Sequence, residues 1–389
     1  MKRQIMANAS YWLNYLQGVA DDRLIPEPDL RGAARALETT IAVPEAWPLT
    51  KVLALALHPH MERRGYWADW DGFLQNLTVY ARQCADPEAE AELFNRQGTI
   101  QRQRGDYKAA LLSSRRAWWL FRQAGNPLGR ARALCNLGDL YRLQERFRRA
   151  ETLCQEAIAL FETLSVIADL AQAENRLGLI YFDQGRWEEA LPHLTRAETL
   201  WRQISDRHGL AKSLHNLGEL HRRTGKLEEA LTYFQQAIHA YHWVGDEIHV
   251  ARIQLNIGNI YLKQSEFQQA EAIYTQAETI LRRECDRITL ARAHHNLGMV
   301  YTRLGEWREA EACFERAIEG WRSQEDAWNL ANALGEFACL HLACDRRSEA
   351  QACLDQAWQL VSERPEGHYE LLRRELAERR LKLAQEPVE

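Results

Sequence analysis

The sequence lacks long apolar runs and the cysteine patterns that mark several protein classes. No stretch of about 18 apolar residues occurs, which argues against a membrane-spanning helix. The eight cysteines include no C-x-x-C pair, and the N-terminal MKRQIMANAS leads into no secretory apolar segment. We therefore expect free thiols in a reducing, cytoplasmic protein that contacts no membrane.

Motifs of catalysis and of metal binding are also missing. No GxxxxGK[ST] loop, GxSxG elbow or pair of carboxylates occurs in a setting that fits it. His239 and His242 are three residues apart, and His58 and His60 flank a proline. Neither pair has the third and fourth ligands that a zinc site requires. The sequence predicts a protein without enzymatic activity, metal or cofactor.

What the sequence does contain is a repeat of 40 residues. A glycine column holds Gly98, Gly138, Gly178, Gly218, Gly258 and Gly298, with Ala338 at its end. Two alanine columns run through seven repeats, at Ala110, Ala150, Ala190, Ala230, Ala270, Ala310 and Ala350, and at Ala117, Ala157, Ala197, Ala237, Ala277, Ala317 and Ala357. Apolar residues between them recur at helical spacing, so each repeat is predicted to be a pair of helices.

The small residues and the polar residues of each repeat have separate expected roles. Glycine inside a helix costs roughly 1 kcal/mol relative to alanine, so the glycine column predicts close crossings of paired helices. A second set of glycines suits the helix C-termini within each pair, at Gly105, Gly185, Gly225 and Gly305. Helix N-caps are predicted between pairs, at Asp86, Asn126, Asp206, Asp246, Asp286 and Asp326, with Val166 breaking the series.

The segments NLGDLY, RLGLIY, NIGNIY and NLGMVY, each followed by the two alanines, resemble the signature of the tetratricopeptide repeat (TPR) family. A period of 40 residues and the stretches DRHGLAKS and NPLGRARA resemble the LGN-type adaptor repeats and the TPR sensor arms of bacterial STAND regulators. The resemblance implies an all-α fold, a right-handed α-solenoid of stacked antiparallel helix pairs, in a bacterial protein that binds other proteins or peptides.

We predict four parts along the chain. They are an N-terminal helical cap over 1–50, a degenerate capping repeat over 51–87, seven repeats over 88–364, and a C-terminal capping helix and tail over 365–389. In the degenerate repeat, His58 stands in the glycine column and Trp70 in the first alanine column. Bulky residues there would open the hairpin, which suits a terminal unit. The N-terminal helices are also a candidate surface for self-association.

The side of each first helix that is not used for packing is expected to line a continuous concave groove. In the fourth repeat this side comprises six positions, Lys212, His215, Asn216, Glu219, Arg222 and Arg223. Over seven repeats the six positions hold five acidic residues, Glu92, Asp139, Asp183, Glu219 and Glu336, in a chain whose net charge is −5. Against them stand twelve basic residues, Arg96, Arg102, Arg132, Arg142, Arg176, Lys212, Arg222, Arg223, Arg252, Lys263, Arg292 and Arg303. The groove is therefore predicted to be basic, and the second helices acidic.

A ladder of asparagines runs along the same groove, formed by Asn136, Asn216, Asn256 and Asn296 in one column, with Asn259 one turn further along its helix. In the resembled adaptors, equivalent asparagines hold the backbone of an extended peptide and arginines hold its acidic side chains. The alternative is that these amides bond the neighbouring hairpin and the arginines pair with acids of adjacent helices. The predicted partner-binding residues are Arg132, Asn136, Lys212, Asn216, Arg222, Arg223, Arg252, Asn256, Asn259, Lys263, Arg292, Asn296 and Arg303.

Three functions are consistent with this pattern. The first is an interaction scaffold or sensor arm that binds an acidic peptide or protein segment in the groove. The second is a signalling regulator that binds a small peptide or metabolite, held compactly at one end of the groove. The third is nucleic-acid binding, which the acidic remainder of the chain disfavours. Binding to duplex DNA would weaken steeply with salt, by about 0.9 in log K per neutralised phosphate for each tenfold rise in salt.

Overall fold

The computed structural model describes residues 1–19, 25–63, 66–362, 364 and 369–385. These residues form α-helices and one short 3₁₀ helix, with no strand among them, which confirms the predicted all-α fold. The chain divides into two compact units, residues 1–245 and 246–389. The predicted C-terminal tail beyond residue 385 and the segment 365–368 lie outside the described residues.

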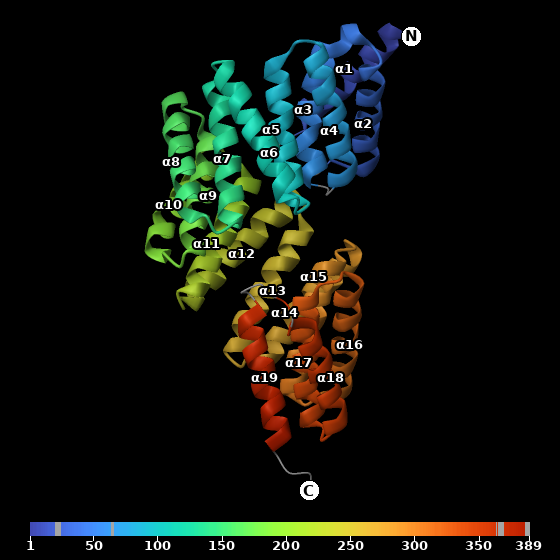
Figure 1. Ribbon diagram of the computed structural model, residues 1–389, viewed down its shortest axis with the longest axis vertical. Helices are drawn as coiled ribbons and strands as arrows, with labels where there is room; N and C mark the ends of the chain where they lie inside the picture. The colour runs from blue at the N-terminus through green and yellow to red at the C-terminus, as the bar shows by residue number, and fades with distance from the viewer. Residues whose placement is uncertain (20–24, 64–65, 363, 365–368, 386–389) are drawn as a thin grey trace. The chain divides into compact units, whose positions relative to one another are not determined.

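The first unit begins with four helices and continues with four helix pairs (Figure 1). The opening elements are α1 (Lys2–Gly18), α2 (Glu27–Ile41), the 3₁₀ helix η1 (Pro44–Ala46), α3 (Trp47–Arg63) and α4 (Trp67–Gln83). The pairs are α5 (Pro87–Gln103) with α6 (Tyr107–Gln123), α7 (Pro127–Leu143) with α8 (Phe147–Leu164), α9 (Ile167–Asp183) with α10 (Trp187–Gln203), and α11 (Arg207–Arg223) with α12 (Leu227–Val244).

The second unit contains three pairs and a closing helix. The pairs are α13 (Glu247–Lys263) with α14 (Phe267–Arg283), α15 (Arg287–Leu304) with α16 (Trp307–Ser323), and α17 (Ala327–Ala343) with α18 (Arg347–Val361). The closing helix is α19 (Tyr369–Gln385). In each unit, the first helices of successive pairs also contact one another, as they do in the inner layer of a solenoid. No described helix is long and apolar enough to cross a bilayer.

The glycine column marks the closest approach within each pair, as predicted. A Cβ atom added to Gly218 would lie 2.6 Å from Cδ1 of Phe234, and one added to Gly258 would lie 2.3 Å from Cε1 of Tyr274. The alanines of both columns are fully buried in all seven pairs. The paired helices can therefore pack closely only because these positions lack a side chain or carry a single methyl group.

The turns and helix starts follow the predicted capping chemistry. All six residues of the N-cap column accept a hydrogen bond from the backbone N–H three residues later; Asp206, for example, accepts from Gly209 at 2.8 Å. Val166 makes no such bond. The turn glycines within pairs have positive φ, for example +80° at Gly225. Glu145 and Ser265 adopt the same left-handed conformation in equivalent turns, so the turn does not depend on glycine alone.

The hairpin of α3 and α4 differs from the others because two columns carry bulky residues. α3 and α4 make far fewer close backbone contacts with each other than the helices of the seven later pairs do. Trp70 is buried between them, and its indole Nε1 donates a hydrogen bond to Nδ1 of His58 at 3.0 Å. The two side chains that replace a glycine and an alanine thus fill the space of a widened crossing.

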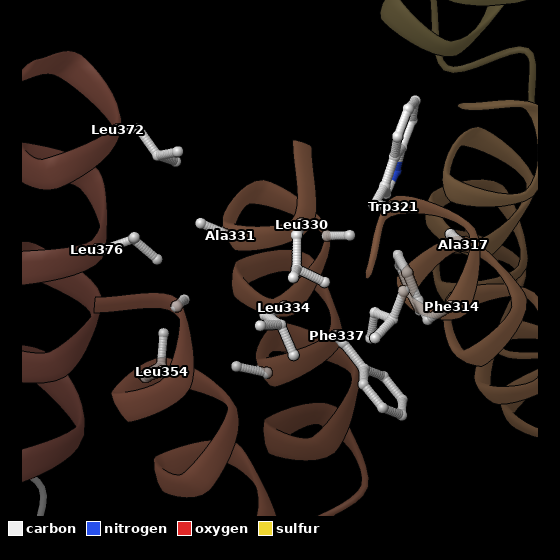
Figure 2. Close-up of a cluster of buried hydrophobic side chains, with 14 of the residues drawn as sticks. Phe314, Ala317, Trp321, Leu330, Ala331, Leu334, Phe337, Leu354, Leu372 and Leu376 are labelled. Carbon is white, nitrogen blue, oxygen red and sulfur yellow. The ribbon is translucent and has the colours of Figure 1, made fainter. Parts of the chain in front are cut away.

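The last pair is closed by α19, whose apolar face covers the end of the second unit. Leu372 and Leu376 point from α19 toward α17 and α18, where Leu334 and Leu354 lie (Figure 2). All four leucines are almost completely buried. Arg379 of α19 reaches back toward the inner layer, where its Nη2 lies 2.6 Å from Oε1 of Glu336.

The cysteines are all free, which leads to a prediction about their reactivity. Burial raises the pKa of Cys135 to about 11 and the pKa of Cys154 well above its usual range. In the folded protein, we expect Cys84 and Cys285, which are exposed, to react at once with a thiol reagent. Cys135 and Cys154 should react only after unfolding. A time course of reagent absorbance checks this, and fewer than eight thiols in denaturant would contradict it.

Candidate functional site

A cavity lined mainly by first helices lies in the inner layer of each unit. The first-unit cavity has a volume of about 280 Å³ and is lined by α3, α5, α7, α8, α9 and α11. The second-unit cavity has a volume of about 710 Å³ and is lined by α13, α14, α15, α16, α17 and α19 together with Ser265. Both cavities lie where the sequence predicts the groove. The contacts of each predicted site residue there indicate whether it is available to a ligand.

The asparagine ladder bonds largely to itself. Nδ2 of Asn136 donates to Oδ1 of Asn95 at 2.8 Å, and Oδ1 of Asn136 accepts from Nη1 of Arg176 at 3.0 Å. Two further amides also donate from one first helix to an asparagine on the preceding first helix. Nδ2 of Asn216 donates to Oδ1 of Asn175 at 2.9 Å, and Nδ2 of Asn296 donates to Oδ1 of Asn259 at 3.1 Å. Asn259 also accepts from the hydroxyl of Tyr274. Asn256 has an interacting partner as well.

These contacts match the alternative reading of the ladder, in which each amide ties one repeat to the next. The partners Asn95 and Asn175 occupy another of the six groove positions, where the other repeats carry cysteine, histidine, leucine or glycine. An amide on an inner helix must be paired whether or not a ligand is bound, so its recurrence alone does not identify a ligand contact.

Several predicted cations of the first unit are held by carboxylates of their own unit. Nε and Nη2 of Arg132 donate to the two carboxylate oxygens of Asp169, both at 2.8 Å, and this bidentate bond raises the pKa of Arg132. Arg222 and Arg223 share Glu219 on the same helix, at 2.8 and 3.3 Å from their Nε atoms. Lys212 is exposed and has an interacting partner.

A buried carboxylate organises three further arginines of the first unit. Asp139 is 6% exposed, and its oxygens lie 3.0 Å from Nε of Arg142 and 3.4 Å from Nη1 of Arg102. Burial alone would raise the pKa of Asp139, but the charges of Arg102, Arg176 and Arg142 hold it below its usual value. These residues form an internal ion network, in which Asp139 neutralises the arginines without a ligand.

The cations of the second unit are different, because most of them lack an internal partner. Arg252 pairs with Asp286 at 3.1 Å. In the described part of the chain, no carboxylate lies within 4.0 Å of the charged nitrogens of Lys263, Arg292 or Arg303. Desolvation and the neighbouring charge of Arg252 lower the pKa of Arg292. Three exposed cations of this unit are thus available to an anionic partner.

The second-unit cavity combines one of these cations with apolar surface. Arg303 lines it together with Met299, Phe314 and Cys339, and the Glu336–Arg379 ion pair lies at its α17–α19 side. Its lining is mixed, because Ser265, Thr302 and the three charged residues stand beside the apolar ones. A mixed lining suits an organic ligand that carries charged groups. Here the group without a carboxylate partner is the guanidinium of Arg303.

The described residues offer no cluster of three or more histidine, cysteine or acidic side chains that could hold a metal ion. His58 and His60, the pair that flanks Pro59, are both buried in α3. His239 and His242 lie on α12. The imidazole of His221 stacks on the ring of Tyr233, with 5.1 Å between the ring centroids. His341 packs against Phe337 in a tilted arrangement, with 4.3 Å between the centroids.

Comparison with protein families decides the class of this architecture. Family profiles described as tetratricopeptide repeat match residues 130–166, 169–241, 215–283 and 289–363, which together span more than half of the chain. The chain is a tetratricopeptide repeat protein. Its helix pairs, glycine crossings and alanine columns are the structural form of that repeat. No match was found among curated proteins.

Solved structures of several tetratricopeptide repeat proteins share the fold. A STAND signal-transduction ATPase with a tetratricopeptide repeat sensor from Pyrococcus horikoshii aligns with a TM-score of 0.66 and 15% identity, covering 91% of this chain and 55% of that one. A Rap protein complexed with competence and sporulation factor aligns with a TM-score of 0.60 and 14% identity, covering 98% and 100%. The quorum sensor NprR from B. thuringiensis gives 0.60 and 14%, covering 92% and 99%.

Proposed function

We propose that this tetratricopeptide repeat protein is an interaction scaffold or sensor arm whose inner layer binds an acidic peptide or protein segment. The observation that carries the proposal is the set of second-unit cations without a carboxylate partner among the described residues, Lys263, Arg292 and Arg303, of which Arg303 lines the second-unit cavity. Acidic side chains would supply the missing carboxylates, and the apolar residues of the lining would hold the methylene groups between them. A cytoplasmic, bacterial setting forms part of the same proposal.

Two further considerations support this function. Solved proteins of the same fold include a Rap protein complexed with competence and sporulation factor and a quorum sensor, so ligand-dependent signalling suits the architecture. The other predicted groove residues would contact the ligand through donors and acceptors that their internal bonds do not use. Arg252 can bridge Asp286 and a ligand, because a guanidinium has five N–H donors. The same additional contacts to a ligand would come from Arg132, Asn136, Lys212 and Asn216.

Charge reversal in the second unit tests the proposal. The probe is a fluorescein-labelled peptide of ten glutamates, and binding is measured by fluorescence anisotropy. We expect Lys263→Glu combined with Arg303→Glu to weaken binding at least tenfold, which corresponds to roughly 1.4 kcal/mol. The melting temperature should hardly change, because neither side chain makes an internal ion pair.

The matched control reverses two exposed arginines of α16, Arg308→Glu and Arg316→Glu. It changes the net charge equally but lies on a second helix. Equal weakening by both double variants would show a non-specific charge effect and would contradict an inner-layer site. Binding of duplex DNA with a steep salt dependence, but not of the acidic peptide, would favour the nucleic-acid alternative.

Asn256 provides a separate test of how the backbone of a bound segment is held. Replacing Asn256 with alanine should weaken binding to peptides of any charge pattern, because a side-chain amide bonds a peptide backbone regardless of its side chains. The comparison uses a peptide of ten glutamates and one of alternating glutamate and serine. A loss seen with only one of them would show that Asn256 contacts side chains instead.

A further inference from the structure

The first-unit cavity contains a hydrogen-bond donor that the protein leaves without an acceptor. His58 is 1% exposed, and its Nδ1 accepts the indole N–H of Trp70 at 3.0 Å. A neutral imidazole whose Nδ1 accepts must carry its proton on Nε2. Burial and the nearby charge of Arg96 lower the pKa of His58 well below its usual value, so the ring is neutral and Nε2–H is a donor.

This donor lies at the wall of the cavity and has no partner. No acceptor in the described part of the chain comes within hydrogen-bond distance of Nε2 of His58. The closest carboxylate oxygen, Oε2 of Glu62, is 3.6 Å away, and Glu62 itself accepts from Gln103. Nε of Arg96 is a second buried donor without a partner on the same cavity, although Nη2 of that guanidinium bonds Glu92 at 2.9 Å.

The charge of the lining indicates the sign of the missing acceptor. Five cations line the cavity, Arg96, Arg102, Arg132, Arg176 and Lys212, together with two carboxylates, Glu62 and Asp169. Two further carboxylates bind lining cations, Glu92 at Arg96 and Asp139 at Arg102, so four carboxylates stand against the five cations. Asp169 is already bound by both nitrogens of Arg132 that face it. The balance is slightly positive, and among the buried lining atoms two N–H donors and one acceptor, Oε1 of Gln103, lack a partner in the described part of the chain. A singly charged anion that accepts hydrogen bonds therefore suits the cavity better than a cation.

The number of vacant donors and the size of the cavity narrow the choice of anion. Arg102, Arg132 and Arg176 each already bind an internal partner, Asp139, Asp169 and Asn136. Among the buried donor atoms of the lining, Nε2 of His58 and Nε of Arg96 lack a partner in the described part of the chain. A carboxylate has two oxygens and can accept from both donors, and its single negative charge matches the small excess of positive charge better than the two charges of a phosphate do. About 280 Å³ admits a compact group.

We infer that the first-unit cavity is a binding site for a carboxylate, which accepts hydrogen bonds from Nε2 of His58 and Nε of Arg96. The inference rests on the proposed function, whose ligand class it refines, and it concerns a separate site in the first unit. The carboxylate comes either from an acidic segment or from a free small dicarboxylic acid. Trp70 is a positioning residue, because its indole fixes which nitrogen of His58 carries the proton.

Two substitutions of His58 separate binding from packing. Glutamine places an amide N–H where Nε2 lies but leaves the indole of Trp70 without an acceptor. Asparagine keeps an acceptor for Trp70 but has no donor that reaches the cavity. A purely structural role of His58, which includes the hydrogen bond from Trp70, would therefore affect His58→Gln at least as much as His58→Asn. Melting temperatures of the two full-length variants establish that they are folded.

The experiment follows the Nε2 signal of His58 by NMR in full-length protein with nitrogen-15-labelled histidine, assigned by its loss in both variants. The probes are glutarate at millimolar concentration and the peptide of ten glutamates. We expect one or both probes to shift the Nε2 signal. Affinity for the active probe should fall at least tenfold in His58→Asn and less than threefold in His58→Gln.

The outcomes distinguish this site from the function proposed for the second unit. A shift with glutarate identifies a free dicarboxylic acid as ligand, and a shift with the peptide alone identifies an acidic segment; either supports the inference. Peptide binding without a shift at His58, or equal affinity in His58→Asn and wild type, overturns the inference and leaves the second-unit site standing. No shift with either probe also overturns it.

Discussion

Replacing Gly218 with leucine is expected to lower the free energy of unfolding by at least about 3 kcal/mol, the upper end of what overpacking of a core usually costs. A Cβ atom at this position would already lie 2.6 Å from Cδ1 and 3.2 Å from Cγ of Phe234. The phenyl ring is itself fully buried, so it has little room to move aside. Urea denaturation followed by circular dichroism measures the loss.

A turn glycine of the same pair provides the control. Gly225 has φ of +80°, and a Cβ atom there would meet nothing within 4 Å. Asparagine tolerates this left-handed conformation better than other side chains do, so Gly225→Asn should cost at most about 1 kcal/mol. If both variants lost the same stability, the glycine column would reflect backbone conformation rather than close packing of the helices.

The second large effect is expected at Asp139, whose carboxylate neutralises buried arginines. Asp139→Ala would leave Arg102 and Arg176 close together without this counter-charge, and breaking a buried pair in this way costs about 3–5 kcal/mol. The control is Glu219→Ala, which removes the partner of the half-exposed Arg222 and should cost about 1 kcal/mol or less. Equal losses in thermal melts would show that the network contributes no more than a surface pair.

The pH dependence of this difference has a defined sign. The folded-state pKa of Asp139 lies below its ordinary value of 3.8, so the stabilisation is present above pH 3.8. It is lost as the pH falls through the lowered folded-state value. The stability difference between wild type and Asp139→Ala should therefore be constant near neutral pH and shrink below pH 3.8. A difference that grew on acidification would contradict the assignment of Asp139 as a buried anion.

The repeat architecture could be predicted from the sequence because its determinants are local and periodic. N-caps act over three residues, and the glycine and alanine columns keep one phase through seven repeats. The left-handed residues at Glu145 and Ser265 could not be anticipated in the same way. Their conformation is imposed by the two helices that they join, whereas a sequence pattern points to such a conformation only where glycine marks it.

The charge of the groove was harder to predict, since the acids that neutralise it come from other positions. Asp286 caps α15 through one oxygen and holds Arg252 through the other. Asp169, in the first turn of α9, holds Arg132. Neither aspartate belongs to the six groove positions of each repeat, so a count over those positions overstates the free positive charge. In the described part of the chain, Lys263, Arg292 and Arg303 of the second unit are groove cations that such acids leave without a carboxylate partner.

The role suggested for His58 was also out of reach of the sequence alone. Replacement of a column glycine by histidine and of a column alanine by Trp70 in one repeat signals a changed crossing. The hydrogen bond between the two side chains, and the unsatisfied nitrogen that it leaves, appear only when α3, α4 and the cavity are seen together. Paired departures from a repeat pattern are the signal that could have directed attention there.

Site-specific photo-crosslinking tests the central claim, that the inner layer binds an acidic segment, most directly. A photoreactive residue is placed at Thr302, which lines the second-unit cavity, or at Glu319, which is exposed on α16. After irradiation in a lysate of the source organism, the attached segment is identified by mass spectrometry. The account predicts capture at Thr302 of a segment rich in aspartate and glutamate, and none at Glu319. Capture at Glu319 but not at Thr302, or capture at Thr302 of a segment without acidic residues, would contradict it.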